Sequence, residues 1–275
     1  MACFRRDRPR AVAWVLAVLS VPSVLPGTPA EPASRGGARI VVRYIGQEVP
    51  SDPRARLWGK IAPVRIPLKA QTLSPPYGGG SIKAVTLRAI HNGRQVAFLL
   101  EWVDPTRDVR MDGLDSFRDA AALMFPLDSR NPPQPIMGQR YMGESSALVN
   151  IWQFKADWNE EGRSSPVEDL NAAGPGTLTT QDRQDVSGKG VHRSGRWKVI
   201  FLRSLRTDDE DDARFWPGLK TWVNVAVWDG SHKDHAGQKS VSEIWHRLTF
   251  EPTPVRIFPD KGPTGFPPLD QVPIC

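Results

Sequence analysis

Cysteine is nearly absent from this sequence, which has two cysteines in 275 residues. Cys3 stands near the start and Cys275 is the last residue, so neither an internal disulfide framework nor a cysteine-ligated iron–sulfur centre is expected. The motif Cys-x-x-Cys-His is missing, which excludes a covalent c-type haem. Gly-x-Ser-x-Gly, phosphate-loop and His-Glu-x-x-His motifs are also missing. The sequence therefore lacks the common signatures of hydrolases, nucleotide-binding enzymes and zinc proteases.

Long apolar runs are also scarce, and the one near the start is short. Four arginines precede an apolar stretch, residues 11–25, that Pro22 interrupts before the small residues that end at Ala30. This pattern predicts a secretory signal peptide cleaved near Ala30, with export by the Sec route to the periplasm. A retained anchor is the alternative, but the stretch is too short for a stable membrane span.

Cleavage at Ala30 would remove four arginines and one aspartate, which lowers the formal net charge from +6 to +3. The remaining chain has no basic patch typical of a nucleic-acid-binding protein. Its 40% hydrophobic and 24% charged content is that of a globular domain. We therefore expect a folded exported protein that does not bind nucleic acid.

The sequence is rich in proline, with 26 residues, and this argues against a helical bundle. Runs of apolar and β-branched residues recur instead, and Asn92-Gly93 between two of them predicts a hairpin turn. The fold class predicted is all-β: a single β-sandwich of two mainly antiparallel sheets with long loops and few short helices. The predicted strands are 39–45, 64–69, 82–91, 95–103, 120–125, 147–154, 197–202, 221–228 and 241–250.

One domain accounts for most of the chain. The expected division is a signal peptide over 1–30, an N-terminal linker and first strand over 31–56, a β-sandwich over 57–251 and a proline-rich tail over 252–275. Within the sandwich, residues 159–193 are polar and aperiodic, which predicts a long surface loop. The tail is expected to lie along a partner or to stay disordered.

Two polar clusters have spacings that suggest metal ligands. His232 and His235 are three residues apart, but their polar surroundings favour a solvated loop. The acidic run 208–212 lacks the spaced oxygen ligands and central glycine of a known calcium loop. It is interpreted as a solvated acidic turn or a docking patch.

Four segments together carry a resemblance to a known family. They are Pro135-Ile-Met-Gly138, the run from Leu148 to Trp158, Ala226-Val-Trp-Asp-Gly230 and Gly237-Gln-Lys-Ser-Val-Ser242. With these segments the sequence resembles, from about Trp58 to Phe250, the haem-binding gamma subunit of ethylbenzene dehydrogenase. Its relatives are the gamma subunits of dimethylsulfide dehydrogenase, selenate reductase and chlorate reductase.

The resemblance implies a β-sandwich that holds haem b non-covalently between two axial ligands. One is the methionine of Pro-x-Met-Gly, here Met137, and the other is the lysine of Gly-x-Lys-Ser, here Lys239. A thioether stabilises ferrous iron, and a lysine binds iron only as its free amine. Iron with both axial positions filled has no site for substrate, so the chain is expected to transfer single electrons and not to be an enzyme.

Other residues compete for these roles. Met142 also precedes a glycine, and Met111 and His246 are weaker rivals for the axial positions. Asn150, Trp152 and Trp228 are expected either to line the haem pocket or to form ordinary sandwich core. These alternatives remain open at this stage.

The resemblance also implies the partners. A molybdenum catalytic subunit and an iron–sulfur subunit of the same complex would supply or receive electrons, with a soluble carrier such as a c-type cytochrome outside it. The alternative is a carbohydrate- or small-ligand-binding β-sandwich without haem, because the ten tryptophans would suit stacking on sugars. The substrate of the complex belongs to another chain.

The predicted signal peptide has a direct test. We expect the secreted protein to begin near Glu31, because cleavage follows small residues such as those at 28–30. N-terminal sequencing of protein from the periplasmic fraction measures this start. A first residue of Met1 would contradict the prediction.

Overall fold

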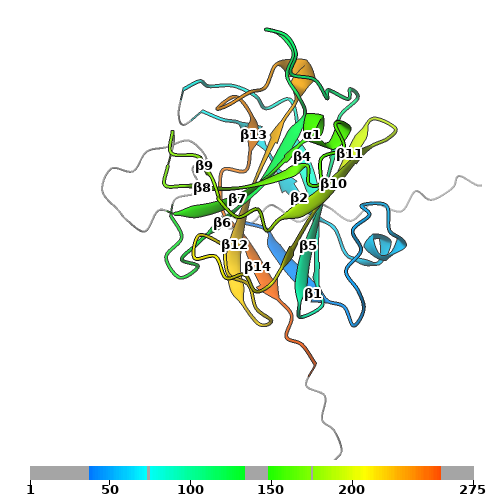
Figure 1. Ribbon diagram of the computed structural model, residues 1–275, viewed down its shortest axis with the longest axis vertical. Helices are drawn as coiled ribbons and strands as arrows, with labels where there is room; N and C mark the ends of the chain where they lie inside the picture. Colours follow the sequence, from blue (N-terminus) through cyan, green and yellow to red (C-terminus); the bar gives the residue numbers. More distant parts are fainter. Residues whose placement is uncertain (1–36, 73–74, 134–147, 175, 255–275) are drawn as a thin grey trace, which may run out of the picture. The chain divides into compact units, whose positions relative to one another are not determined.

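The computed structural model describes residues 37–72, 75–133, 148–174 and 176–254 of the chain (Figure 1). Its elements are β1 (Arg39–Tyr44), η1 (Arg56–Lys60), β2 (Val64–Pro67), β3 (Lys69–Ala70), β4 (Ala84–His91), β5 (Gln95–Val103), β6 (Ala120–Pro126), β7 (Val149–Lys155), α1 (Ala156–Glu160), β8 (Val167–Ala172), β9 (Thr179–Thr180), β10 (Ser187–His192), β11 (Arg196–Ser204), β12 (Lys220–Trp228), η2 (Gly230–His232), β13 (Ser240–Val241) and β14 (His246–Phe250). The prediction of an all-β sandwich with few short helices is confirmed. The predicted signal peptide and most of the tail lie outside the described residues. No helix in the described ranges is long and apolar enough to cross a membrane.

The strands form two layers that share β12. One layer has the order β10-β11-β5-β4-β1-β14-β12, and the other continues as β12-β6-β7-β8-β9 (Figure 1). The first half of β12 pairs with β14 and its second half pairs with β6. Most pairs are antiparallel, as predicted, but β1 is parallel to both β4 and β14.

A single large core fills the space between the layers. Alternate residues of each strand point into it, as the twofold repeat of a strand requires. At its centre the rings of Phe98, Phe125, Trp152 and Phe215 meet one another at centroid separations of 4.8–6.5 Å. Burial of such rings supplies most of the free energy that holds the layers together.

The second layer is apolar on its outer face as well. Side chains that alternate with the inner ones on β6, β7, β8 and β12 form a separate buried cluster. A sheet with two apolar faces must have something covering the second one. The members of this outer cluster are Ala120, Ala122, Met124, Val149, Ile151, Leu170, Ala172, Ala226, Trp228, Val241 and Trp245.

The prediction of a long surface loop over residues 159–193 is wrong. This segment contains β8, β9 and β10, and β10 pairs with β11 along its whole length. The strand β10 was not predicted because two of its six residues are glycines. A Cβ on Gly188 would overlap the backbone of Ile200, and one on Gly190 would overlap the ring of Phe154. Glycine is therefore selected here by close packing, although it is a poor strand former.

Two further expectations need correction. The strand predicted over 241–250 is interrupted between β13 and β14, where the Asn224 amide donates to the carbonyl oxygens of Ser242 and Ile244 at 2.9 and 3.1 Å. The acidic run is not wholly solvated, because Asp212 is buried and its Oδ1 lies 2.8 Å from Nη1 of the buried Arg203. A buried arginine requires such a partner.

Candidate functional site

Lys239 occupies a position that its backbone holds firmly. Its N–H donates to the carbonyl of Gly78 at 3.2 Å, and its own carbonyl accepts from the N–H of Gln71 at 3.1 Å. Gly78, Gly79 and Gly80 all have positive φ, and a Cβ on Gly79 would overlap the carbonyl group of Lys239. Only glycine permits this close approach. The loop 71–80 therefore fixes where the lysine side chain starts.

The Lys239 amine lies against an aromatic ring and has no anionic partner in the described ranges. Its Nζ is 4.9 Å from the centroid of the Trp228 ring, and no carboxylate there is within ion-pair distance of it. Burial lowers the pKa of this amine from 10.5 to about 8. Desolvation has this effect because it penalises the charged form. The free-base amine, which can bind a metal, is consequently accessible close to neutral pH.

Trp228 places this lysine at the apolar outer face of the second layer. It is the last residue of β12, and its indole N–H donates to the carbonyl of Ala236 at 3.1 Å. That bond closes the loop between β12 and β13, which ends at Lys239. Lys239 and Trp228, both singled out from the sequence, are thus brought together by a single loop.

The chain that leads toward Met137 is attached to the same face. Trp222 donates its indole N–H to the carbonyl of Ser129 at 3.1 Å, and Trp245 donates to the carbonyl of Pro133 at 2.6 Å. Both tryptophans pack with the outer cluster. Met137 and its rival Met142 lie outside the described residues. Residue 133 is nevertheless fixed on the face that carries Lys239.

Asn150 and Trp152 point the other way, into the core between the layers. Trp152 is fully buried there and donates its indole N–H to Oδ1 of Asn150 at 3.0 Å. The Asn150 amide donates to Asp169 at 2.5 Å, and its oxygen accepts from Arg203 at 3.3 Å. The two residues therefore belong to a buried polar network and do not share a face with Lys239.

The remaining rival ligands differ sharply from Lys239 in their surroundings. Both ring nitrogens of His246 are already bonded, Nδ1 to the N–H of Ala38 at 2.8 Å and Nε2 to the Ser242 hydroxyl at 2.6 Å. Burial lowers the pKa of this imidazole to about 4. Met111 is 50% exposed, on a loop. His246 is thus committed to structural bonds.

The loop 71–80 was missed by the sequence analysis. Three consecutive glycines after Tyr77 were the available signal, since such a run indicates close backbone approach or positive φ. Nothing in the sequence pairs that run with a lysine 160 residues later, because the contact is made only when β13 pairs with β3.

A known protein family matches the part of the chain that contains the loop 71–80 and Lys239. The model of the family described as ethylbenzene dehydrogenase matches residues 55–167 and 158–240. A Haloferax mediterranei protein named as a respiratory nitrate reductase heme subunit, ORF7, is 31% identical over 249 residues, which cover 90% of this chain and 85% of that protein.

Two gamma subunits are also similar. The chlorate reductase gamma subunit of Ideonella dechloratans is 28% identical, with 86% of this chain and 96% of that protein covered. The dimethylsulfide dehydrogenase gamma subunit of Rhodovulum sulfidophilum is 30% identical, with 71% and 74% covered. A solved structure described as a carbohydrate-binding protein, from Bacteroides uniformis, has a TM-score of 0.50 at 10% identity, with 78% of this chain and 100% of that chain covered. At that identity the likeness concerns the fold alone.

Lys239 should lower the free energy of unfolding of the cofactor-free chain. Its folded-state pKa of about 8 is below the ordinary 10.5, so the unfolded chain holds the proton more tightly. The resulting destabilisation is greatest below pH 8, where the amine is protonated in both the folded and the unfolded chain, and it disappears as the pH rises through 10.5. Lys239→Met should therefore raise the free energy of unfolding at pH 7 by about 1–3 kcal/mol, with a gain that shrinks toward pH 10.5.

Urea denaturation across this pH range measures the effect. Lys220→Met, at an exposed lysine that begins β12, is the matched control and should give no such pH-dependent gain. A loss of stability in Lys239→Met at pH 7 would contradict a net desolvation cost of the Lys239 amine.

Proposed function

Because the chain belongs to the ethylbenzene dehydrogenase family, we propose that it is the haem-binding electron-transfer subunit of a molybdenum oxidoreductase complex. The observation that carries the proposal is Lys239, an amine partly buried beside Trp228 with a lowered pKa and no carboxylate partner in the described ranges. Relatives named as a heme subunit and as gamma subunits support it.

The surroundings of Lys239 suit a haem iron ligand better than a lysine with a purely structural role. A structural lysine is normally solvated or paired with a carboxylate, as Lys155 is with Glu168 on the same sheet. Lys239 is only partly solvated and is paired with no carboxylate in the described ranges, and its lowered pKa favours the neutral amine that coordination requires. The apolar face next to it, with Trp228, would suit a porphyrin ring.

We propose Met137 as the second axial ligand. Pro133 is held on the outer face by Trp245, and the four residues onward to Met137 can span at most about 14 Å. Met137 is therefore within reach of that face. Met142 is its rival, nine residues from Pro133, and both remain candidates that the ligand experiment below separates.

Haem b bound in this way would supply one-electron exchange between ferric and ferrous iron. The protein's own contribution would be to hold an unprotonated amine at a fixed place. The glycine loop 78–80 fixes the Lys239 backbone, and the Trp228 ring lies against its amine. With lysine and methionine as ligands, no open iron position would remain for substrate, so catalysis would belong to another subunit.

We also propose the assembly and its location. The partners would be a molybdenum catalytic subunit and an iron–sulfur subunit, with a soluble c-type cytochrome as external carrier, in the periplasm. The gamma-subunit names of the relatives support a multi-subunit complex. The alternative of a haem-free carbohydrate-binding module is less well supported, because Trp216 is the one exposed tryptophan in the described ranges. Sugar platforms need exposed rings.

The axial ligands have separable variants. Met137→Ala should lower the reduction potential, because the thioether that stabilises ferrous iron is lost. Lys239→Ala should give a high-spin ferric spectrum and weaker haem retention, because a thioether alone binds ferric iron poorly. Visible spectra and redox titration of the full chain, expressed with adequate haem, measure both changes.

Met111→Ala is the matched control, because this methionine is exposed and should leave spectrum and potential unchanged. Unaltered spectra in both ligand variants, together with a change in Met142→Ala, would reassign the methionine. A colourless wild-type protein would favour the haem-free module instead.

A further inference from the structure

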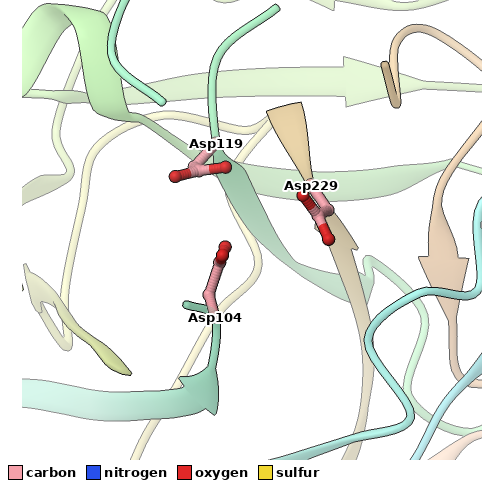
Figure 2. A group of neighbouring side chains, drawn as sticks. All are labelled: Asp104, Asp119 and Asp229. Atoms are coloured by element: carbon pink, nitrogen blue, oxygen red, sulfur yellow. The ribbon is translucent and has the colours of Figure 1, made fainter. Parts of the chain in front are cut away.

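Three aspartates at the ends of β5, β6 and β12 lie close together (Figure 2). Asp104 follows β5, Asp119 precedes β6 and Asp229 follows β12. Each contributes a carboxylate oxygen that lies within 4.8 Å of the other two, and all three side chains are buried. The residues come from both layers, so the cluster connects them.

The hydrogen bonds of Asp119 hold its carboxylate in place. Oδ1 accepts from the N–H of Gly230 at 2.9 Å, and Oδ2 accepts from the N–H of Asp108 at 2.8 Å and from the indole of Trp197 at 2.9 Å. Neutral donors of this kind orient the group but do not cancel its charge. The cluster therefore remains anionic unless protons or a cation neutralise it.

Asp104 carries the observation that points to a ligand. Its Oδ1 accepts from the N–H and hydroxyl of Thr106 at 3.1 and 3.0 Å. Its Oδ2 is completely buried and accepts no hydrogen bond of good geometry, and the indole N–H of Trp102, which lies near this carboxylate, is itself left without a partner. Figure 2 shows this carboxylate directed toward Asp119. A buried carboxylate oxygen without a partner is costly, so this one, which faces Asp119 within a group of three carboxylates, would be stabilised by a positive charge.

No lysine or arginine supplies that charge in the part of the chain described here. His232 is the one basic side chain paired with the cluster, through its Nδ1 at 2.8 Å from Oδ2 of Asp229, and it is largely exposed. Burial raises the pKa of Asp119 to about 7, and it also raises that of Asp104, with the charge of Asp229 adding to the effect. Desolvation is the main cause of both shifts, and repulsion from a neighbouring carboxylate adds to each, whereas hydrogen bonds from Ser231 and His232 lower the pKa of Asp229.

We propose that Asp104, Asp119 and Asp229 bind one Ca²⁺ ion. The donor set is oxygen only, which suits a hard cation and not a soft one. A buried set of three protein carboxylates suits Ca²⁺, which accepts six to eight oxygen ligands in flexible geometry, whereas Mg²⁺ usually keeps several waters and is rarely held by protein groups alone. The three carboxylate oxygens lie within 4.8 Å of one another, so one ion can contact all of them.

The ion would stabilise the end of the sandwich at which β5, β6 and β12 meet. Asp229 also begins the loop that closes at Lys239, and its Oδ1 accepts from the Ser231 hydroxyl at 2.7 Å inside that loop. Calcium would therefore tie the start of this loop to both layers. The assignment stands on the aspartates alone and does not require haem.

Calcium binding is tested on the full exported chain after treatment with EDTA. Calcium should raise the midpoint of thermal unfolding by about 3 °C or more, and gel-filtered protein should retain one calcium per chain by elemental analysis. Magnesium at the same concentration should give a smaller shift. An equal shift with magnesium would overturn the assignment to calcium.

Asp104→Asn keeps the size of the side chain and an oxygen for Thr106, but it removes a negative charge. It should lose the calcium-dependent shift and be at least as stable as the wild type in EDTA, because repulsion is relieved. Asp112→Asn, at an exposed carboxylate paired with Arg110, should keep the full shift. A shift retained in Asp104→Asn would overturn the site. If that variant fails to fold, the metal content of the wild type decides, and calcium-free protein overturns the proposal.

Discussion

The structure depends on one constraint, the backbone hydrogen bonds that hold Lys239 beside Trp228. Because its N–H and carbonyl are bonded to Gly78 and Gln71, the side chain starts at a fixed place, and its amine lies over the Trp228 ring, which attracts the ammonium form, with no anionic partner in the described ranges. Folding then imposes a desolvation cost that appears as a lowered pKa. Such a cost is retained at functional sites when the displaced proton makes room for another ligand. The role of iron ligand that we propose for Lys239 would account for this cost.

The second layer of the sandwich explains why the lysine lies where it does. Its inner face supplies the main core, and its outer face is apolar too, so the sheet separates two environments. Asn150 and Trp152 belong to the inner one, where a polar network with Arg203 and Asp212 is fully enclosed. Lys239 and Trp228 belong to the outer one, together with the chain that approaches residue 134. Trp152 therefore belongs to the inner core, whereas Trp228 lies on the outer face beside Lys239.

Much of the fold could be predicted because the local sequence preferences for strands and turns match the structure that forms. The hairpin between β4 and β5 follows from Asn92-Gly93, and Gly93 does adopt a positive φ of 86°. The prediction for residues 159–193 was wrong, because the glycines of β10 are required by groups that pack against them from distant parts of the chain. The family resemblance singled out Lys239, Met137 and Trp228 as individual candidates, and they remain predictions, but it gave no geometry for the site. Neither the contact of Gly79 with Lys239 nor the meeting of three aspartates has a local signal.

The axial pair that we propose is the neutral amine of Lys239 and a methionine thioether. Near-infrared magnetic circular dichroism of the oxidised full chain tests it most directly, because the energy of the ligand-to-iron charge-transfer band depends on the identity of the axial pair. The account predicts a low-spin ferric spectrum with one amine and one thioether ligand. A high-spin spectrum, or one typical of two nitrogen ligands, would contradict it.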